Sequence, residues 1–292
     1  MTRSFHHLFS GVCWACALLP VAGMFFLIGF LLRQSRGSLN LHLFFGDTPP
    51  LDAILHFAPV WDGIWPACFG TLCVVALAGV VAVPLGILCG IHLSEFAKGR
   101  FRGLLSFCVD LLAGVPSILM GLFGFALILF LRHTMLPNAG TGLLLSGFCI
   151  GLLVLPYMVN ATYSTLSGLP QDLRLLGPGL GLTHMQSIRH ILLPSASKGI
   201  LSGVVLSLGR AAEDTAVIML TGVVVNAGMP RSLFDKYEAL PFYIYTTAAE
   251  YQTPEDLHRG FGAALVLLIL TTGLFLTAHL WHRTMERRWR HG

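Results

Sequence analysis

The chain has 292 residues, of which 55% are hydrophobic and only 11% carry charged side chains. Soluble proteins are about 25% charged, and 18 Lys and Arg with 14 Asp and Glu are too few to cover a soluble protein of this size. A soluble enzyme, a disordered regulator and a nucleic-acid-binding protein are therefore excluded as first interpretations. The net charge of +4 is small, so the positions of the charges matter more than their sum.

Long uncharged stretches separate the few charges. A helix needs about 20 mostly apolar residues to cross a hydrocarbon core of roughly 30 Å. The apolar runs are continuous rather than alternating, which favours helices over the strands of a membrane barrel. We therefore expect an all-α, polytopic membrane protein with six transmembrane helices, in chain order at about 11–32, 66–93, 107–131, 143–164, 199–224 and 261–282.

The first apolar stretch has two interpretations, a cleaved signal peptide or a retained helix. It stays uncharged from Arg3 to Arg33, which is longer than the core of about 7–15 residues in a signal peptide, and no small-residue cleavage site follows. We expect a retained helix. The expected organisation is an N-terminal helix and external loop at 1–65, a five-helix transmembrane domain at 66–282 and a basic tail at 283–292.

Orientation follows from the Lys and Arg of the connecting segments. With the N-terminus inside, the inner segments carry 11 Lys and Arg and the outer segments carry 6. Both termini are therefore expected in the cytoplasm. The tail, flanked by Trp281 and Trp289, is expected to anchor at the lipid interface.

Motifs for catalysis and metal binding are weak or absent from the sequence. Cys13 and Cys16 are spaced like a redox or metal pair, but no second pair follows, and we interpret them as small residues of an apolar helix. The sequence has no phosphate-binding loop of the GxxxxGK[ST] type, no serine nucleophile elbow and no HExxH. We expect a protein that is not an enzyme and holds no metal or other cofactor.

The connection between the fourth and fifth expected spans, at 169–194, differs from the others. It is bounded by prolines and interleaves Leu, Met and Ile with polar residues, a pattern typical of short amphipathic helices. Two interpretations remain open from the residues alone: an element that docks another protein, or a loop that lies on the membrane surface.

The same loop carries a recognisable spacing. Gly181, Ile191, Leu193 and Pro194 follow the order G-x9-I-x-L-P and precede the penultimate span. This resembles the coupling motif of ABC-importer permeases. The resemblance implies a short coupling helix that sits in a groove of a separate ATP-binding subunit, which would hold ATP and Mg²⁺.

The chain departs from this family pattern at its beginning. Leu175, Leu176 and Gly177 stand where the family has Glu-Ala-Ala, and Pro178 follows. The chain therefore lacks the carboxylate that makes the usual polar contact to the ATPase. A proline at this position is also expected to break the coupling helix.

Other stretches narrow the resemblance to the permeases of phosphate importers. Residues 112–118 with 121–124 are similar to their third-helix signature, and 84–87 with 93–96 to the end of their second helix. Residues 209–216 are similar to their fifth-helix pattern A-R-A-x-G-E-T-A, with Glu213 and Asp214 in place of Gly and Glu. The likeness covers about 60–282 and is nearest to the A-type subunit.

The resemblance implies a type I ABC importer permease in a bacterial inner membrane. Expected partners are a C-type permease subunit, two ATP-binding subunits, an extracytoplasmic phosphate-binding protein and the lipid bilayer, and no nucleic acid. The translocation path would lie between the two permease subunits, and movement would be coupled to ATP hydrolysis through the 169–194 loop.

Arg210, Glu213 and Asp214 form a charged turn inside the fifth expected span. A charge at mid-membrane costs about 2.5–3.5 kcal/mol on insertion scales, so such residues face a cavity or each other. At spacings i,i+3 and i,i+4 both carboxylates can reach the guanidinium. Two interpretations stand: the turn lines the translocation path, or it is an internal ion pair. Ser117, beside Pro116, is a lesser candidate for the path, and a backbone-bonding role for it is equally open.

Three alternatives to a phosphate importer are retained. The first is an ABC importer permease for another oxyanion or small solute. The second is a membrane sensor or scaffold that does not transport, in which the departure at Leu175–Pro178 marks lost coupling. The third is a stand-alone channel or carrier, which should show paired internal repeats, and none is evident in the sequence.

Overall fold

The computed structural model describes the backbone of residues 2–56, 58–134 and 136–290. These residues form an all-helical fold, and one isolated bridge pairs Val223 with Tyr237. The helices are α1 (Thr2–Gln34), α2 (Leu41–Phe45), α3 (Pro50–Leu55), α4 (Trp65–Ile91), the π-helix η1 (His92–Phe96), α5 (Gly99–Ala113), α6 (Ser117–Thr134), α7 (Leu143–Ser167), α8 (Gln171–Gly179), α9 (His184–Ser187), the π-helix η2 (Ile188–Leu192), α10 (Leu193–Glu213), α11 (Ala216–Thr221), α12 (Leu240–Glu250) and α13 (Pro254–Arg290).

Six helical segments among the described residues are long and apolar enough to cross a membrane, which confirms the expected number of spans. They are Phe9–Gln34, Trp65–Phe96, Ser117–Thr134, Leu143–Ser167, His184–Glu213 and Pro254–Thr277. The segment at 33–65, which is expected to be external, contains α2 and α3 rather than loop alone. The tail expected at 283–292 continues α13 as far as Arg290, and residues 291–292 lie outside the described part.

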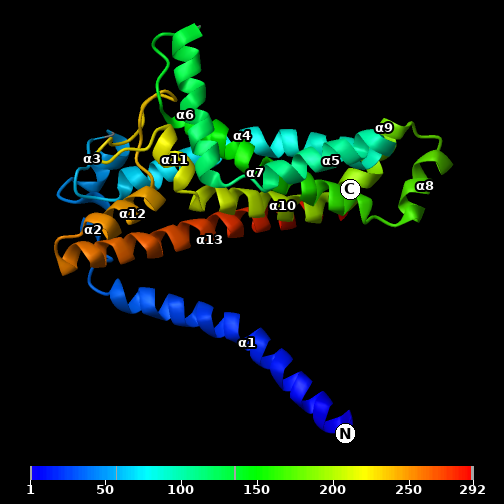
Figure 1. The fold of residues 1–292 in the computed structure, drawn as a ribbon, viewed down its shortest axis with the longest axis horizontal. Coiled ribbons are helices and arrows are strands. Elements are labelled where there is room, and N and C mark those ends of the chain that lie inside the picture. The colour runs from blue at the N-terminus through cyan, green and yellow to red at the C-terminus, as the bar shows by residue number, and fades with distance from the viewer. Residues whose placement is uncertain (1, 57, 135, 291–292) are drawn as a thin grey trace.

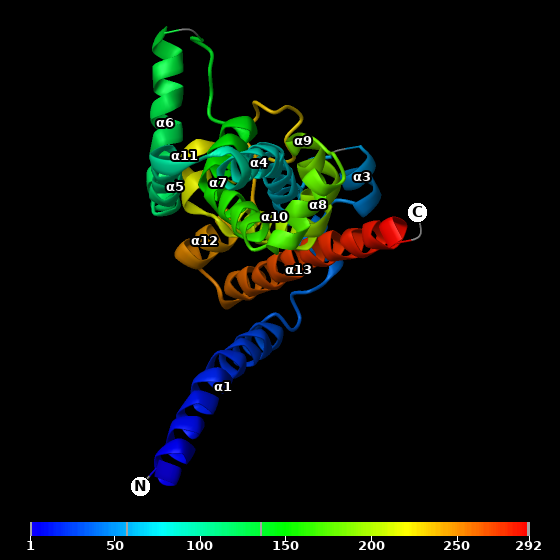
Figure 2. The ribbon, with the colours of Figure 1, turned by 90° about the vertical axis from the view of Figure 1, so that its right-hand side faces the viewer.

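A bundle of α4, α7, α10 and α13 forms the body of the molecule, with these helices side by side along its longest axis (Figure 1). Helix α6 stands across that axis, and α1 diverges from the bundle in both views (Figures 1 and 2). Helix α1 meets the bundle near its C-terminal end, where the Phe30 ring packs edge-on against Phe261 with centroids 5.5 Å apart. His258 Nδ1 also lies 2.8 Å from the carbonyl oxygen of Gln34.

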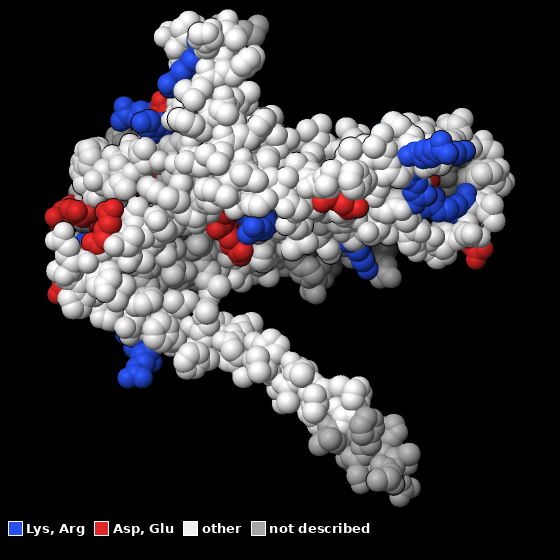
Figure 3. Space-filling model, in the orientation of Figure 1, with Lys and Arg blue, Asp and Glu red and all other residues white. Residues whose placement is uncertain are grey.

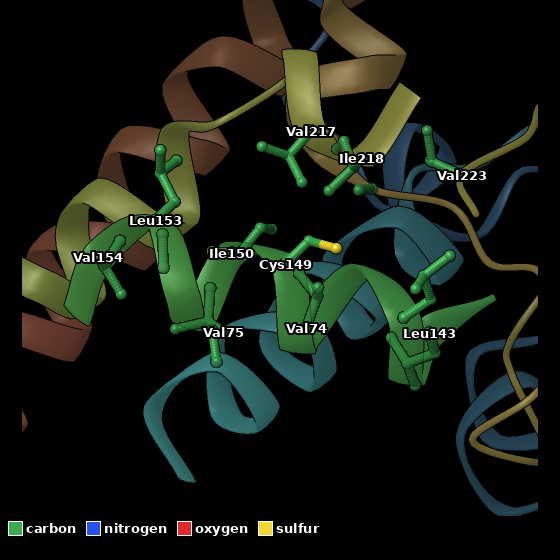
Figure 4. Packing of buried hydrophobic residues seen from close by; sticks show 14 of the residues in the cluster. Val74, Val75, Leu143, Cys149, Ile150, Leu153, Val154, Val217, Ile218 and Val223 are labelled. Carbon is green, nitrogen blue, oxygen red and sulfur yellow. The ribbon is translucent and has the colours of Figure 1, made fainter. Parts of the chain in front are cut away.

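Small residues allow α4 and α7 to approach closely. A Cβ added at Gly147 would lie 2.6 Å from Leu77 Cβ, and one at Gly151 would lie 2.9 Å from Val81 Cβ. Transmembrane helices associate through such small residues because lipid supplies no hydrophobic force between them. Figure 4 shows the resulting core, in which Val74 and Val75 of α4 and Cys149 and its neighbours on α7 pack beneath α11.

The third expected span, 107–131, is wrong in its bounds. Helix α5 ends at Ala113, and the membrane-crossing helix α6 begins only at Ser117. Pro116 explains the break, because proline has no N–H to donate and disfavours the helical conformation of the preceding residue. Asp110 consequently belongs to α5, which packs against α7, and not to the third span.

The fifth expected span, 199–224, is also wrong in its bounds. The membrane-crossing segment begins at His184 and ends at Glu213, and the short helix α11 follows as a separate element. Asp214 has an extended backbone (φ −75°, ψ 118°), and its Oδ1 accepts the N–H of Val217 at 2.9 Å. This carboxylate caps the first turn of α11, which stabilises a new helix start at this point. The charged turn therefore lies at a helix break.

Charged side chains are sparse over the face shown in Figure 3, where they gather toward the two ends of the bundle with a small group midway. Helix α1 begins and α13 ends on the side of the molecule that carries α8 and α9 (Figure 1). The two ends of the described chain and the 169–194 segment therefore share one side of the bundle.

Candidate translocation path and coupling segment

Arg210 occupies the last turn of α10 and faces the carboxylate of Asp214 across the helix break. Arg210 Nη2 lies 4.0 Å from Asp214 Oδ2, a long ion pair. The Asp214 side chain is 2% exposed, whereas that of Arg210 is 42% exposed. The other carboxylate oxygen of Asp214 accepts a hydrogen bond from the Val217 N–H. Most of the donors of the guanidinium therefore remain available to a ligand.

Glu213 does not join this pair as expected. It ends α10 with an exposed side chain, and the ion pair recorded for Arg210 within the described chain is the one with Asp214. The spacing allows both carboxylates to reach the guanidinium, but among the described residues only Asp214 lies within ion-pair distance, because the Glu213 side chain is exposed. Asp214 keeps this contact although the break after Glu213 turns it out of α10 and into the first turn of α11.

Ser117 is the first residue of α6. The packing of α6 against α11 determines where Ser117 lies along the bundle. A Cβ at Gly121 would lie 3.0 Å from the Ala216 carbonyl oxygen, and one at Gly124 would lie 2.7 Å from Thr221 Cγ2. The two helices thus run in the same direction in close contact. Ser117 precedes Gly121 by one turn on the same face, which places it toward the break before Ala216.

This arrangement suits a weakly held oxyanion. A guanidinium presents a planar fork of donors that matches phosphate oxygens. The distant carboxylate of Asp214 reduces the net charge near Arg210 without occupying its donors. An anion can therefore bind to the fork and leave it again, as a transport path requires.

The 169–194 segment folds into the two short helices α8 and α9 and the π-helix η2, as the amphipathic pattern predicts. Three large apolar side chains stand out among its exposed residues, with Leu175 67%, Leu180 71% and Met185 62% exposed. Gly181 sits between α8 and α9 with φ +70°, in the left-handed region that favours glycine. A capping box between Thr183 and Gln186 starts α9.

The remaining residues of the coupling motif face the bundle. Ile191, Leu193 and Pro194 are half-buried. Their neighbours Ile188 and Leu192 are 2% exposed and pack in a cluster with residues of α4 and α7. The motif therefore divides into an exposed part around Leu175 and Gly181 and an anchored part at 191–194, where Pro194 occupies the first turn of α10.

Pro178 does not end α8 at the residue before it, as the sequence predicted. The helix runs through Pro178 and ends one residue later, at Gly179. The backbone then closes with the N–H of Leu182 bonded to the Gly177 carbonyl at 3.0 Å. The expected break is displaced to the C-terminal end of α8, where the N–H that Pro178 lacks is followed by only one further helical residue.

An ion pair that the sequence did not single out lies beside this segment. Arg174 Nη1 bonds both carboxylate oxygens of Glu95, at 2.8 and 2.7 Å, and the Glu95 side chain is 3% exposed. The two residues are 79 positions apart. The available sequence signal was weak: Glu95 is the first charge after Asp62, at the end of a long apolar run.

Comparison with known proteins places the chain in a family. Residues 82–291 match the pattern of the binding-protein-dependent transport system inner membrane component family. The phosphate transport system permease protein PstA of Mycobacterium leprae is 34% identical over 280 residues, which cover 88% of this chain and 86% of that protein. The phosphate transport system permease protein PstC 1 of Mycobacterium bovis is 28% identical over 253 residues, covering 75% and 74%.

A solved structure supports the fold independently of sequence. The crystal structure of a bacterial ABC transporter involved in the import of the acidic polysaccharide alginate matches with a TM-score of 0.63 over 97% of this chain and 99% of that chain, at 15% identity. The six spans, the ABC-importer fold and the sequence relatives agree. The chain belongs to the PstA family of phosphate transport permeases, which are multi-pass inner-membrane subunits of ABC importers and not enzymes.

Proposed function

We propose that this permease carries phosphate across the membrane, with Arg210 as the group that meets the anion in the path. The observation that carries the proposal is the 42% exposed guanidinium beside a 2% exposed carboxylate at a helix break. Glu213 and Ser117 are proposed as lesser polar groups of the same path. An importer for another oxyanion would use the same guanidinium, so the substrate assignment rests on the PstA relatives.

The proposed assembly has four further subunits. A C-type permease subunit completes the path, in keeping with the likeness to PstC 1. Two ATP-binding subunits supply ATP and Mg²⁺, and an extracytoplasmic phosphate-binding protein delivers the substrate. With both termini cytoplasmic, the α8–α9 side faces the ATP-binding subunits.

We further propose that the exposed apolar surface of α8 and α9 is the coupling surface. Leu175 stands on it where the family pattern begins with a carboxylate, and Leu180 and Met185 are exposed on the same segment. Docking in this chain would therefore rest on apolar contact rather than on a polar bond. Gly181 shapes the turn, Pro178 ends α8, and Ile191, Leu193 and Pro194 anchor the segment to the bundle.

Reconstitution with the partner subunits tests the path. Proteoliposomes that contain the complex and external phosphate-binding protein are assayed for uptake of radiolabelled phosphate. Arg210→Ala is expected to abolish uptake while the complex still assembles. Arg100→Ala, which removes an exposed guanidinium from α5, is the matched control and should transport normally. Uptake by Arg210→Ala at the wild-type rate would refute the path assignment.

Replacement of the exposed apolar residues tests the coupling surface. Leu180→Ser with Met185→Ser is preferable to a deletion, because Ile188 nearby is only 2% exposed and holds the fold. We expect this variant to lose ATPase stimulation by phosphate-loaded binding protein. Full stimulation in the variant would show that the ATP-binding subunits dock elsewhere.

A further inference from the structure

The guanidinium of Arg174 joins three elements at the α8–α9 side of the bundle. It bonds both oxygens of Glu95 in η1, which continues α4. Its Nη2 donates to the carbonyl oxygen of Leu166, in the last turn of α7, at 2.7 Å. The Leu166 carbonyl also accepts the N–H of Leu169 at 3.2 Å, so Arg174 adds a second bond at the end of α7. One side chain thus connects α8 with the ends of both α4 and α7.

The carboxylate of Glu95 is held from more than one direction. Besides the two bonds from Arg174, the hydroxyl of Ser94 donates to Glu95 Oε1 at 2.8 Å. The Glu95 side chain is 3% exposed and that of Arg174 is 30% exposed. Because Nη1 bonds both carboxylate oxygens while Nη2 bonds the Leu166 carbonyl, the guanidinium is fixed from two directions. A shift of α8 relative to η1 would break several bonds at once.

Helix α8 has two distinct faces. Arg174 and Gly177, three residues apart, lie toward the bundle, where Gly177 is buried against the Ser187 side chain. Leu175 and Leu176 are exposed on the remainder of the helix, and Leu180 is exposed directly after its end. The face that would meet an ATP-binding subunit is therefore backed by the face that carries the arginine.

A second contact reinforces the same junction. The ring of Phe96, the last residue of η1, packs edge-on against His184 at the start of α9, with centroids 5.2 Å apart. Residues Glu95 and Phe96 of η1 thus engage α8 and α9 respectively. The coupling segment is held to the end of α4 by an ion pair and by an aromatic contact.

We propose that Glu95 and Arg174 are positioning residues for coupling, the link through which a displacement of α8 is passed to α4 and α7. This inference rests on the proposed function of the α8–α9 surface. Arg174 forms its ion pair within the subunit, with Glu95, and not with the ATP-binding subunit. The pair would make α8 move together with the ends of α4 and α7 during transport.

The test uses the complete complex with single and paired substitutions. Glu95→Gln and Arg174→Gln each remove one charge, Arg174→Lys keeps the charge but loses the fork, and Glu95→Arg with Arg174→Glu exchanges the partners. Assembly is followed by co-purification of the ATP-binding subunits. Basal ATPase activity, stimulation by phosphate-loaded binding protein and phosphate uptake per ATP hydrolysed are then measured. Glu250→Gln, which removes an exposed acid at the end of α12, is the control.

We expect the two single charge-removing variants to assemble and retain basal ATPase activity while stimulation and phosphate uptake per ATP fall to near background. The exchanged pair should recover part of both, and Arg174→Lys should lie between. Wild-type stimulation in assembled Glu95→Gln and Arg174→Gln would overturn the proposal. Failure of every variant to assemble, including Arg174→Lys, would also overturn it, because the pair would then serve the fold alone. A wild-type complex without stimulation would instead refute the proposed function.

Discussion

Two arginine–carboxylate pairs of similar composition differ in how the arginine is used. At the end of α10, Arg210 lies 4.0 Å from Asp214 and is 42% exposed. Beside α8, Arg174 bonds both oxygens of Glu95 and the carbonyl of Leu166, at 2.7 to 2.8 Å. The carboxylates are equally hidden, at 2% and 3% exposed. A buried acid is therefore common to both pairs, and the pairs differ in the guanidinium donors that the carboxylate leaves unoccupied.

Removing each carboxylate should give the largest contrast between the two pairs. Glu95→Ala leaves Arg174 without its partner in a partly buried site and should lower the free energy of unfolding by about 3 kcal/mol. Asp214→Ala removes mainly a helix cap and should cost about 1 kcal/mol. Thermal unfolding of the purified variants in one detergent compares the two losses.

A conservative change serves as the control for that comparison. Asp214→Asn retains an oxygen that can accept the N–H of Val217, so its unfolding temperature should stay near that of the wild type. Equal losses for Glu95→Ala and Asp214→Ala would mean that the two pairs play the same structural part, and the contrast would be lost.

A smaller change sharpens the comparison at the coupling segment. In Gly177→Ala the new Cβ would lie 2.3 Å from Ser187 Oγ and 2.6 Å from Ser187 Cβ, so α8 must move relative to α9. Overpacking of this kind costs about 1–3 kcal/mol, and it displaces the helix that carries Arg174. We expect reduced stimulation of the ATPase by phosphate-loaded binding protein.

The second residue of that contact supplies the rescue. Ser187→Gly removes both of the atoms that the new methyl group would meet, so Gly177→Ala with Ser187→Gly should recover stimulation. A Gly177→Ala complex with normal stimulation would show that α8 tolerates displacement and that the Arg174 link is not sensitive to it.

The smallest effect is expected at a third buried carboxylate, for which no arginine of the described residues forms an ion pair. Glu238 lies in the loop before α12, is 8% exposed and accepts the N–H of Gly228 at 2.8 Å. Burial raises the pKa of Glu238 from its ordinary value of 4.5, and the N–H groups of Gly228 and Ala227 offset this only in part. The folded state therefore holds the proton more tightly than the unfolded state.

The sign of the pH dependence follows from that direction. The contribution of Glu238 to stability is complete below pH 4.5 and is lost as pH rises through the raised pKa of the folded state. Glu238→Gln should therefore weaken the decline of the unfolding temperature above pH 4.5, while Glu250→Gln, an exposed acid, leaves it unchanged. An identical pH profile for wild type and Glu238→Gln would contradict the buried, proton-holding state.

The breaks within the third and fifth spans show how local chemistry changes a pattern that hydropathy predicts as continuous. Apolar runs predict membrane crossing, and six were confirmed among the described residues. Pro116 and Asp214 interrupt two of them. The proline was visible in the sequence, but its effect depends on whether neighbouring helices satisfy the freed backbone groups. The cap from Asp214 to Val217 depends on how the chain turns between α10 and α11, which hydropathy does not predict.

The sequence by itself determined membrane residence, the number of spans, the family and the positions of the coupling motif, because composition, apolar length and motif spacing are properties of the chain in order. Only the tertiary structure decided which guanidinium groups are hydrogen-bonded within the protein and which are not. Arg174 meets Glu95 across 79 residues, and Arg210 keeps most of its donors because a helix break carries Asp214 away from it. Hydrogen bonding and burial depend on distances that spacing along the chain does not contain.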